Sequence, residues 1–132
     1  MFEKISIKSS ERNDLIDITN IIQDMIRKNN FTNGLITLFV PHTTAAVTIN
    51  ENADPTVKTD MLKFLKDKIP VNYDFDHMEG NSDAHLKSSI IGPSLSLIVE
   101  EGELILGTWQ GIYFCEFDGP RTRSLYVKSI RG

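Results

Sequence analysis

Strand-like and helix-like segments fail to alternate along this chain, and this excludes a parallel, doubly wound sheet. Six segments are rich in β-favouring residues or have apolar residues at alternate positions, which is typical of strands. They cover residues 2–8, 35–40, 43–50, 94–99, 104–117 and 122–130. The last three predict successive antiparallel strands. The expected class is therefore α+β, with a largely antiparallel sheet and two main helices.

Both helices are predicted from apolar residues that recur every three or four positions. The first stripe begins at Leu15, with Asn13 as the N-cap. The second begins after Asp54, an N-cap candidate, and Pro55, which suits the first helical position; Pro70 ends it. Capping of this helix is a sufficient explanation for Asp54, and membership of a binding site is the alternative.

Length, charge and cysteine usage limit the class of protein. A chain of 132 residues buries roughly two thirds of its unfolded surface, enough for one core, so a single domain over residues 1–132 is expected. The net charge of −4 and pI of about 5.3 do not favour nucleic acid as a partner. The charged N-terminal residues and the absence of an apolar run of about 18 residues predict no export and no membrane span. Cys115, the one cysteine, cannot form an internal disulfide, and a cytoplasmic location is expected.

Three histidines are the rarest side chains with useful chemistry, and each lies in a polar segment. His42 precedes the second strand of the 35–50 region, while His77 and His85 lie within residues 71–93, an irregular connection with one short helix near residues 85–90. Long irregular connections usually carry function. Imidazole binds metals and transfers protons near neutral pH, but the spacing matches no local metal motif. The three are therefore either separate surface histidines or members of one site.

Other candidates stand at the ends of β-rich segments. Glu51 ends an apolar strand just before a helix, where sites often form, although a solvated loop explains it equally well. Gln110 follows Trp109 between two glycines, which permits a packed tryptophan at a bend or the approach of a ligand. Arg121 follows a DGP turn and is either an exposed turn residue or a phosphate clamp. Cys115, within an apolar strand, is expected to be a buried small residue and no nucleophile.

Three long motifs resemble those of the YjbQ-like family, also called the secondary thiamine-phosphate synthase family. They are HTTAAVTINENADP, GNSDAHLKSSIIG and LGTWQGIYFCEFDGPR, in the order and spacing of that family. The resemblance covers essentially the whole chain. One departure is Val99, at or beside a position where a proline is expected.

The resemblance implies a homotrimer with a site near the subunit boundaries, acting on a phosphorylated small molecule. It implies a transferase that joins a pyrimidine methyl diphosphate to a thiazole phosphate and releases pyrophosphate, with a divalent metal, zinc or magnesium, as cofactor. The implied catalytic residues are His42, Glu51, His85 and Gln110. The implied substrate-binding residues are Asp54, Asp83, Lys87 and Arg121. The implied metal ligands are His42, His77 and His85.

Two other functions stay open from the residues alone. The chain lacks a glycine-rich phosphate loop and an aspartate-rich diphosphate motif. A metal-dependent hydrolase would use the same histidines and carboxylates to hold an activated water. A non-catalytic protein that binds a small molecule would keep the pocket without turnover.

Overall fold

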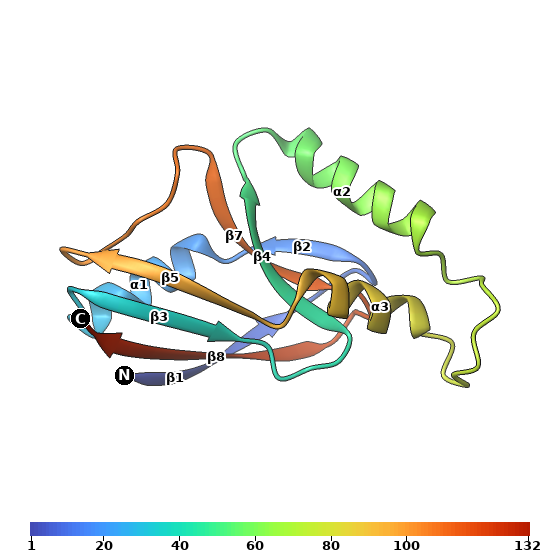
Figure 1. The fold of residues 1–132 in the computed structure, drawn as a ribbon, viewed down its shortest axis with the longest axis horizontal. Coiled ribbons are helices and arrows are strands. Elements are labelled where there is room, and N and C mark those ends of the chain that lie inside the picture. Colours follow the sequence, from blue (N-terminus) through green and yellow to red (C-terminus); the bar gives the residue numbers. More distant parts are fainter.

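The computed structural model describes residues 1–132 as eight strands and three helices (Figure 1). The strands are β1 (Phe2–Lys8), β2 (Asp14–Asp17), β3 (Gly34–Phe39), β4 (Ala45–Glu51), β5 (Ser94–Glu100), β6 (Glu103–Leu104), β7 (Gln110–Glu116) and β8 (Thr122–Arg131). The helices are α1 (Thr19–Lys28), α2 (Pro55–Lys68) and α3 (Ser82–Ile91). The predicted α+β class is confirmed. None of the helices is long and apolar enough to cross a membrane.

The strands form two antiparallel sheets. The larger has the order β1-β8-β3-β5-β6 and the smaller the order β2-β7-β4. The sequence predicted three successive antiparallel strands at the end of the chain, but the second of them, residues 104–117, is divided into β6 and β7, which lie in different sheets. β5 pairs with β3 and β6, β8 pairs with β1 and β3, and β7 lies in the smaller sheet.

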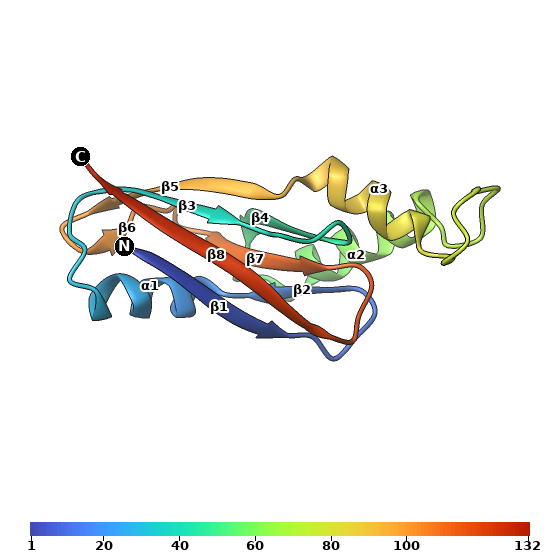
Figure 2. The same cartoon turned by 90° about the horizontal axis from the view of Figure 1, so that it is seen from below.

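β7 lies in the middle of the smaller sheet and is buried on both faces. Ile112 and Phe114 point into the main core, which lies between the two sheets and α1. Tyr113 and Cys115 point the other way, into a second cluster shared with α2 and α3. Figure 2 shows α1 at the end of the molecule opposite α3. Each large apolar side chain buried in this way contributes about 1.5–3 kcal/mol to folding.

The helix predicted from Leu15 starts later than expected. Residues 14–17 form β2, in which Leu15 pairs with Cys115 of β7, and α1 begins at Thr19. Asn13 is therefore not its N-cap; the carboxylate of Asp17 accepts hydrogen bonds from the backbone and hydroxyl of Thr19. A four-residue segment with two central apolar residues fits either a strand or a helical turn, and the pairing with β7 makes this one a strand.

The 71–93 connection contains a longer helix than predicted, and the molecule has three main helices where the sequence predicted two. α3 covers Ser82–Ile91, and its buried side chains are Asp83, Ala84, Lys87 and Ser88. Because this buried face is mostly polar, no apolar stripe marks the helix in the sequence. α2 matches its prediction: Asp54 caps it by accepting from the backbone N–H of Thr56 at 2.9 Å.

Candidate functional site

Two histidines approach each other beside the start of α3. The ring centroids of His77 and His85 lie 5.3 Å apart, with the ring planes at 88°. With Phe75, Ser82 and Leu86 they line a pocket of about 360 Å³, which we call the histidine pocket. Ser82, His85 and Leu86 share one face of α3 because they are three and four residues apart. Apolar walls with two imidazoles suit a planar heteroaromatic ring.

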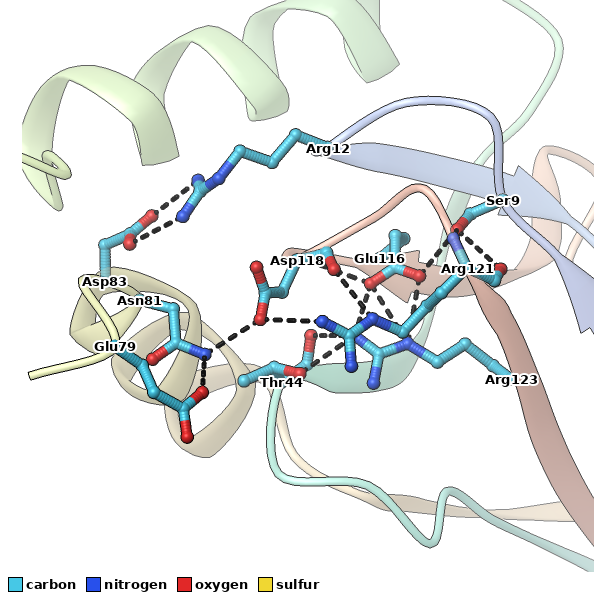
Figure 3. Close-up of polar contacts among 10 residues, drawn as sticks. All are labelled: Ser9, Arg12, Thr44, Glu79, Asn81, Asp83, Glu116, Asp118, Arg121 and Arg123. Carbon is cyan, nitrogen blue, oxygen red and sulfur yellow. Dashed lines mark hydrogen bonds and ion pairs between the residues drawn. The ribbon is translucent and has the colours of Figure 1, made fainter.

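The residue before α3 anchors the histidine pocket to the turn after β7. Asn81 Nδ2 donates to Asp118 Oδ2 at 2.8 Å and to Glu79 Oε2 at 3.4 Å (Figure 3). Arg121 also donates to Asp118 Oδ2, at 3.1 Å. The Asn81 Oδ1 atom is buried and has no hydrogen-bond partner. Its desolvation costs about 1–3 kcal/mol, and no donor in the chain offsets this cost.

A buried carboxylate joins α3 to the loop between β1 and β2. Asp83 accepts two hydrogen bonds from Arg12, both at 3.0 Å, and one from Lys87 at 2.8 Å. Burial opposes ionisation, but the hydrogen bonds from Arg12 and Lys87 outweigh it and hold the pKa of Asp83 below its ordinary value. Since these cations occupy both carboxylate oxygens, we expect Asp83 to position α3 and Lys87 rather than contact a substrate.

A second buried ion pair connects the two sheets. Glu116 of β7 and Arg123 of β8 are both almost fully buried, and Arg123 also donates to the hydroxyl of Thr44 at 2.8 Å (Figure 3). Ser9 donates to Glu116 at 2.7 Å. Burial again opposes ionisation, but these hydrogen bonds outweigh it and lower the pKa of Glu116. Gly119 lies against this pair, and any side chain there would collide with Ser9 and Glu116.

His42 lies beside this second ion pair. Its Nε2 atom accepts a hydrogen bond from the backbone N–H of Ser124 at 2.8 Å. Burial and the positive charge of Arg123 lower the pKa of His42, so the imidazole is neutral near pH 7. A neutral ring that accepts at Nε2 carries its proton on Nδ1.

Three of the predicted residues lie together at the far end of the smaller sheet. Glu51 pairs with Gln110 in the register of β4 and β7, and the Glu51 carboxylate accepts from the backbone N–H of Asp54 at 3.2 Å. At the other end of β4, Ala45 accepts a hydrogen bond from Ser88 of α3 at 2.6 Å. The seven residues of β4 span about 20 Å. Glu51, Asp54 and Gln110 are therefore far from the start of α3 in the same chain.

One chain thus brings His77 and His85 together and distributes the other predicted site residues over separate places. Arg121 belongs to the turn after β7, and its side chain is 49% exposed. No three histidine, cysteine, aspartate or glutamate side chains are grouped so that they could hold a metal ion. A catalytic zinc takes three protein ligands, so one chain offers no such site, and we derive no step through a metal. The predicted ligands His42, His77 and His85 would have to come from more than one chain.

Sequence reasoning missed most of the buried polar residues. These are Ser9, Thr44, Asn81, Ser88, Glu116, Arg123 and Ser129. One signal was available: Glu116 lies two residues after Phe114 and Arg123 two residues before Leu125, so both share a strand face with residues of the main core. Cys115 was predicted correctly as a buried residue, and burial raises the pKa of its thiol to about 12.

The two buried carboxylates predict a loss of stability in acid. Their folded pKa values are lowered, so their contribution is complete above the unfolded values of about 4 and disappears as the pH falls through the folded values. The free energy of unfolding should fall slightly as the pH drops through about 6.5, because the lowered pKa of His42 keeps its imidazole neutral in the folded state only, and fall steeply below about pH 4. Urea unfolding across this range measures it. Asp60→Asn, at an exposed carboxylate without an ion pair, should leave the slope unchanged, and equal stability at pH 3 and pH 7 would contradict the prediction.

Comparison with known proteins gives one consistent result. The family described as UPF0047 protein YjbQ-like matches residues 3–132. UPF0047 protein MJ1081 of Methanocaldococcus jannaschii is 53% identical over 130 residues, which cover 98% of this chain and 94% of that protein. UPF0047 protein YugU of Bacillus subtilis is 53% identical over 131 residues, which cover 98% and 99%.

Solved structures match the fold over nearly its whole length. A YjbQ/UPF0047 family protein of Clostridium acetobutylicum superposes with a TM-score of 0.94 at 49% identity, covering 97% of this chain and 99% of that one. A protein of Sulfolobus solfataricus, described as YbjQ-like and of unknown function, has a TM-score of 0.94 at 31% identity, covering 100% and 97%.

Proposed function

Since this chain belongs to the YjbQ-like UPF0047 family, we propose that it joins a pyrimidine methyl diphosphate to a thiazole phosphate and releases pyrophosphate. This is the reaction that the sequence resemblance implies. The observation that supports it best is the histidine pocket, where Phe75, His77 and His85 offer ring surfaces to a planar heteroaromatic ring. The same helix, α3, carries the buried cation Lys87.

The proposed reaction needs charge stabilisation and no nucleophile on the protein. The thiazole nitrogen attacks the methylene carbon, so an N–C bond forms while the C–O bond to the diphosphate breaks. The electron pair of the C–O bond leaves with the pyrophosphate, and no proton is lost from carbon. In this proposal the rings of the histidine pocket hold the pyrimidine, and a ring N–H of His85 donates a hydrogen bond to the departing oxygen.

We also propose that the site is completed between the chains of a homotrimer. Glu51 and Gln110 lie too far from His85 to act with it in one chain. Large apolar side chains are exposed next to both places: Trp109, beside Gln110, is 63% exposed, and Met78, beside His77, is 98% exposed. In a closed ring, the Glu51 end of one chain would meet the histidine pocket of the next. A zinc or magnesium ion would find a third ligand only at such a boundary, and chelation during the assay tests whether one is needed.

The direct test is formation of thiamine phosphate from the two activated substrates, with product detected by chromatography. We expect slow turnover that His85→Ala lowers by more than about tenfold, because the hydrogen bond to the departing oxygen is lost. Cys115→Ser should leave the rate nearly unchanged, because the buried thiol takes no part. If the wild-type protein formed no product above the uncatalysed background and did not support growth of a strain that lacks its main synthase, the proposal would be wrong. Hydrolysis of phosphate esters that a chelator abolishes would then favour the metal-dependent hydrolase.

A further inference from the structure

A second pocket, of about 710 Å³, lies between α2, α3 and the loop that joins β1 to β2. α3 contributes Lys87 to this pocket, while Ser82, His85 and Leu86 of the same helix line the histidine pocket. The two pockets therefore share a wall. None of the residues assigned to the histidine pocket lines the second one.

The charges around the second pocket have the opposite sign to the protein as a whole. Four cationic side chains line it, Arg12, Lys63, Lys66 and Lys87, against two acidic ones, Glu11 and Asp67. The chain carries a net charge of −4. A concentration of cations in a concave surface raises the local concentration of anions.

Two of these cations share one carboxylate at the base of the pocket. Arg12 and Lys87 both bind Asp83, and no other carboxylate pairs with either of them. One positive charge is thus left without a partner beside a lysine whose side chain is only 2% exposed. Lys87 Nζ donates to Asp83 at 2.8 Å and to Asn13 at 3.4 Å, which accounts for two of the three N–H groups of an ammonium. The third has no acceptor within the chain.

The opposite wall carries two lysines without ion pairs. Lys63 and Lys66 lie three residues apart on one face of α2, and neither forms a salt bridge. Lys66 lies in the last turn of α2, where the negative end of the helix dipole stabilises a positive charge. Lys63 lies outside this turn, so the helix dipole does not explain why a lysine occupies that position. Both side chains are exposed and free to turn towards the pocket.

We propose that this pocket binds a diphosphate group, with Arg12 and Lys87 at its base and Lys63 and Lys66 at its rim. Cations on two facing walls suit two linked phosphates better than a single phosphate. That the diphosphate belongs to the substrate or to the released pyrophosphate rests on the proposed function. The anion site itself rests on the charges and on the spare N–H of Lys87.

Calorimetric titration with inorganic pyrophosphate tests the site without any turnover. We expect a single pyrophosphate per chain, bound more tightly than orthophosphate and more weakly as salt is added. Replacing both rim lysines, Lys63→Ala with Lys66→Ala, should weaken binding by about tenfold or more, because two charges leave the rim. Lys68→Ala, which removes an equal charge from the same helix outside the pocket, should change binding by less than about twofold.

Two results would overturn the assignment: no saturable binding of pyrophosphate, or equal weakening by Lys68→Ala and by the double variant. Equal weakening would indicate that pyrophosphate is attracted by the overall charge of α2 and not held in this pocket. The rim lysines are exposed, so loss of the fold does not confuse the comparison. Pyrophosphate binding without any thiamine phosphate formation would refute the proposed reaction and support the diphosphate site. Thiamine phosphate formation without pyrophosphate binding would support the proposed reaction and refute the diphosphate site.

Discussion

Co-refolding two inactive variants, His85→Ala and Glu51→Gln, is expected to restore about one quarter of the wild-type rate of thiamine phosphate formation. Each variant alone lacks one half of every site. In a randomly mixed trimer, a boundary is intact when the chain that supplies His85 and the chain that supplies Glu51 are both unmutated there. With equal amounts of the two variants, each of these two chains is unmutated at the required residue with a probability of one half. The product of the two probabilities is one quarter.

The geometry of one chain makes this experiment discriminating. Glu51 lies at the end of β4 opposite Ala45, which accepts a hydrogen bond from Ser88 of α3, and the seven residues of this strand span about 20 Å. The matched control is a mixture of His85→Ala with His77→Ala, whose rings meet within one chain and whose mixed trimers should regain nothing. Light scattering should give a mass of three copies of the 14.9 kDa chain. A mass of one copy, or no recovery on mixing, would contradict the shared site.

Arg123→Ala is expected to cause the largest loss of stability, about 3–5 kcal/mol. The substitution leaves Glu116 buried without its cation and removes a donor from Thr44. For a domain of this size the midpoint of thermal unfolding should fall by roughly 10–20 °C. Calorimetry of the purified variant measures it.

The chain supplies a matched control two residues away. Arg121→Ala removes the same side chain from a half-exposed ion pair with Asp118, and such pairs contribute about 0–1 kcal/mol. Replacing both members of the buried pair, Glu116→Leu with Arg123→Met, should recover much of the loss, because no charge is then left unpaired. An Arg123→Ala protein as stable as Arg121→Ala would show that the buried pair does not connect the sheets energetically.

Local signals explain which elements could be predicted from the sequence. The first strand, the strands on either side of Pro41 and the cap at Asp54 all follow from neighbouring residues, and the structure confirms them. β2 was mistaken for a helical turn because its identity depends on β7, about a hundred residues further along the chain. α3 was underestimated because helix periodicity is sought in apolar residues, and this helix buries Asp83 and Lys87.

The candidate site was harder to predict than the fold for the same physical reason. The approach of His77 to His85 involves nearby segments, whereas the position of His42 depends on Ser124, far along the chain. Charged residues in a strand are normally assigned to the solvent face, so the spacing of Glu116 and Arg123 from apolar residues does not identify them as an ion pair until it is known which strands oppose each other. The relation of Glu51 to His85 depends on other chains and stays a prediction.

The burial of β7 on both faces has a consequence for motion. Its backbone is hydrogen-bonded to β2 and β4, and all but its first residue is buried, so it can open only when the whole domain unfolds. α2 has no fully buried side chain and can detach at a much smaller free energy. The pocket proposed to bind a diphosphate thus has the buried Lys87 at its base and its rim on a helix that can move separately. A bound anion would tie the two together, and α2 would close over its own ligand.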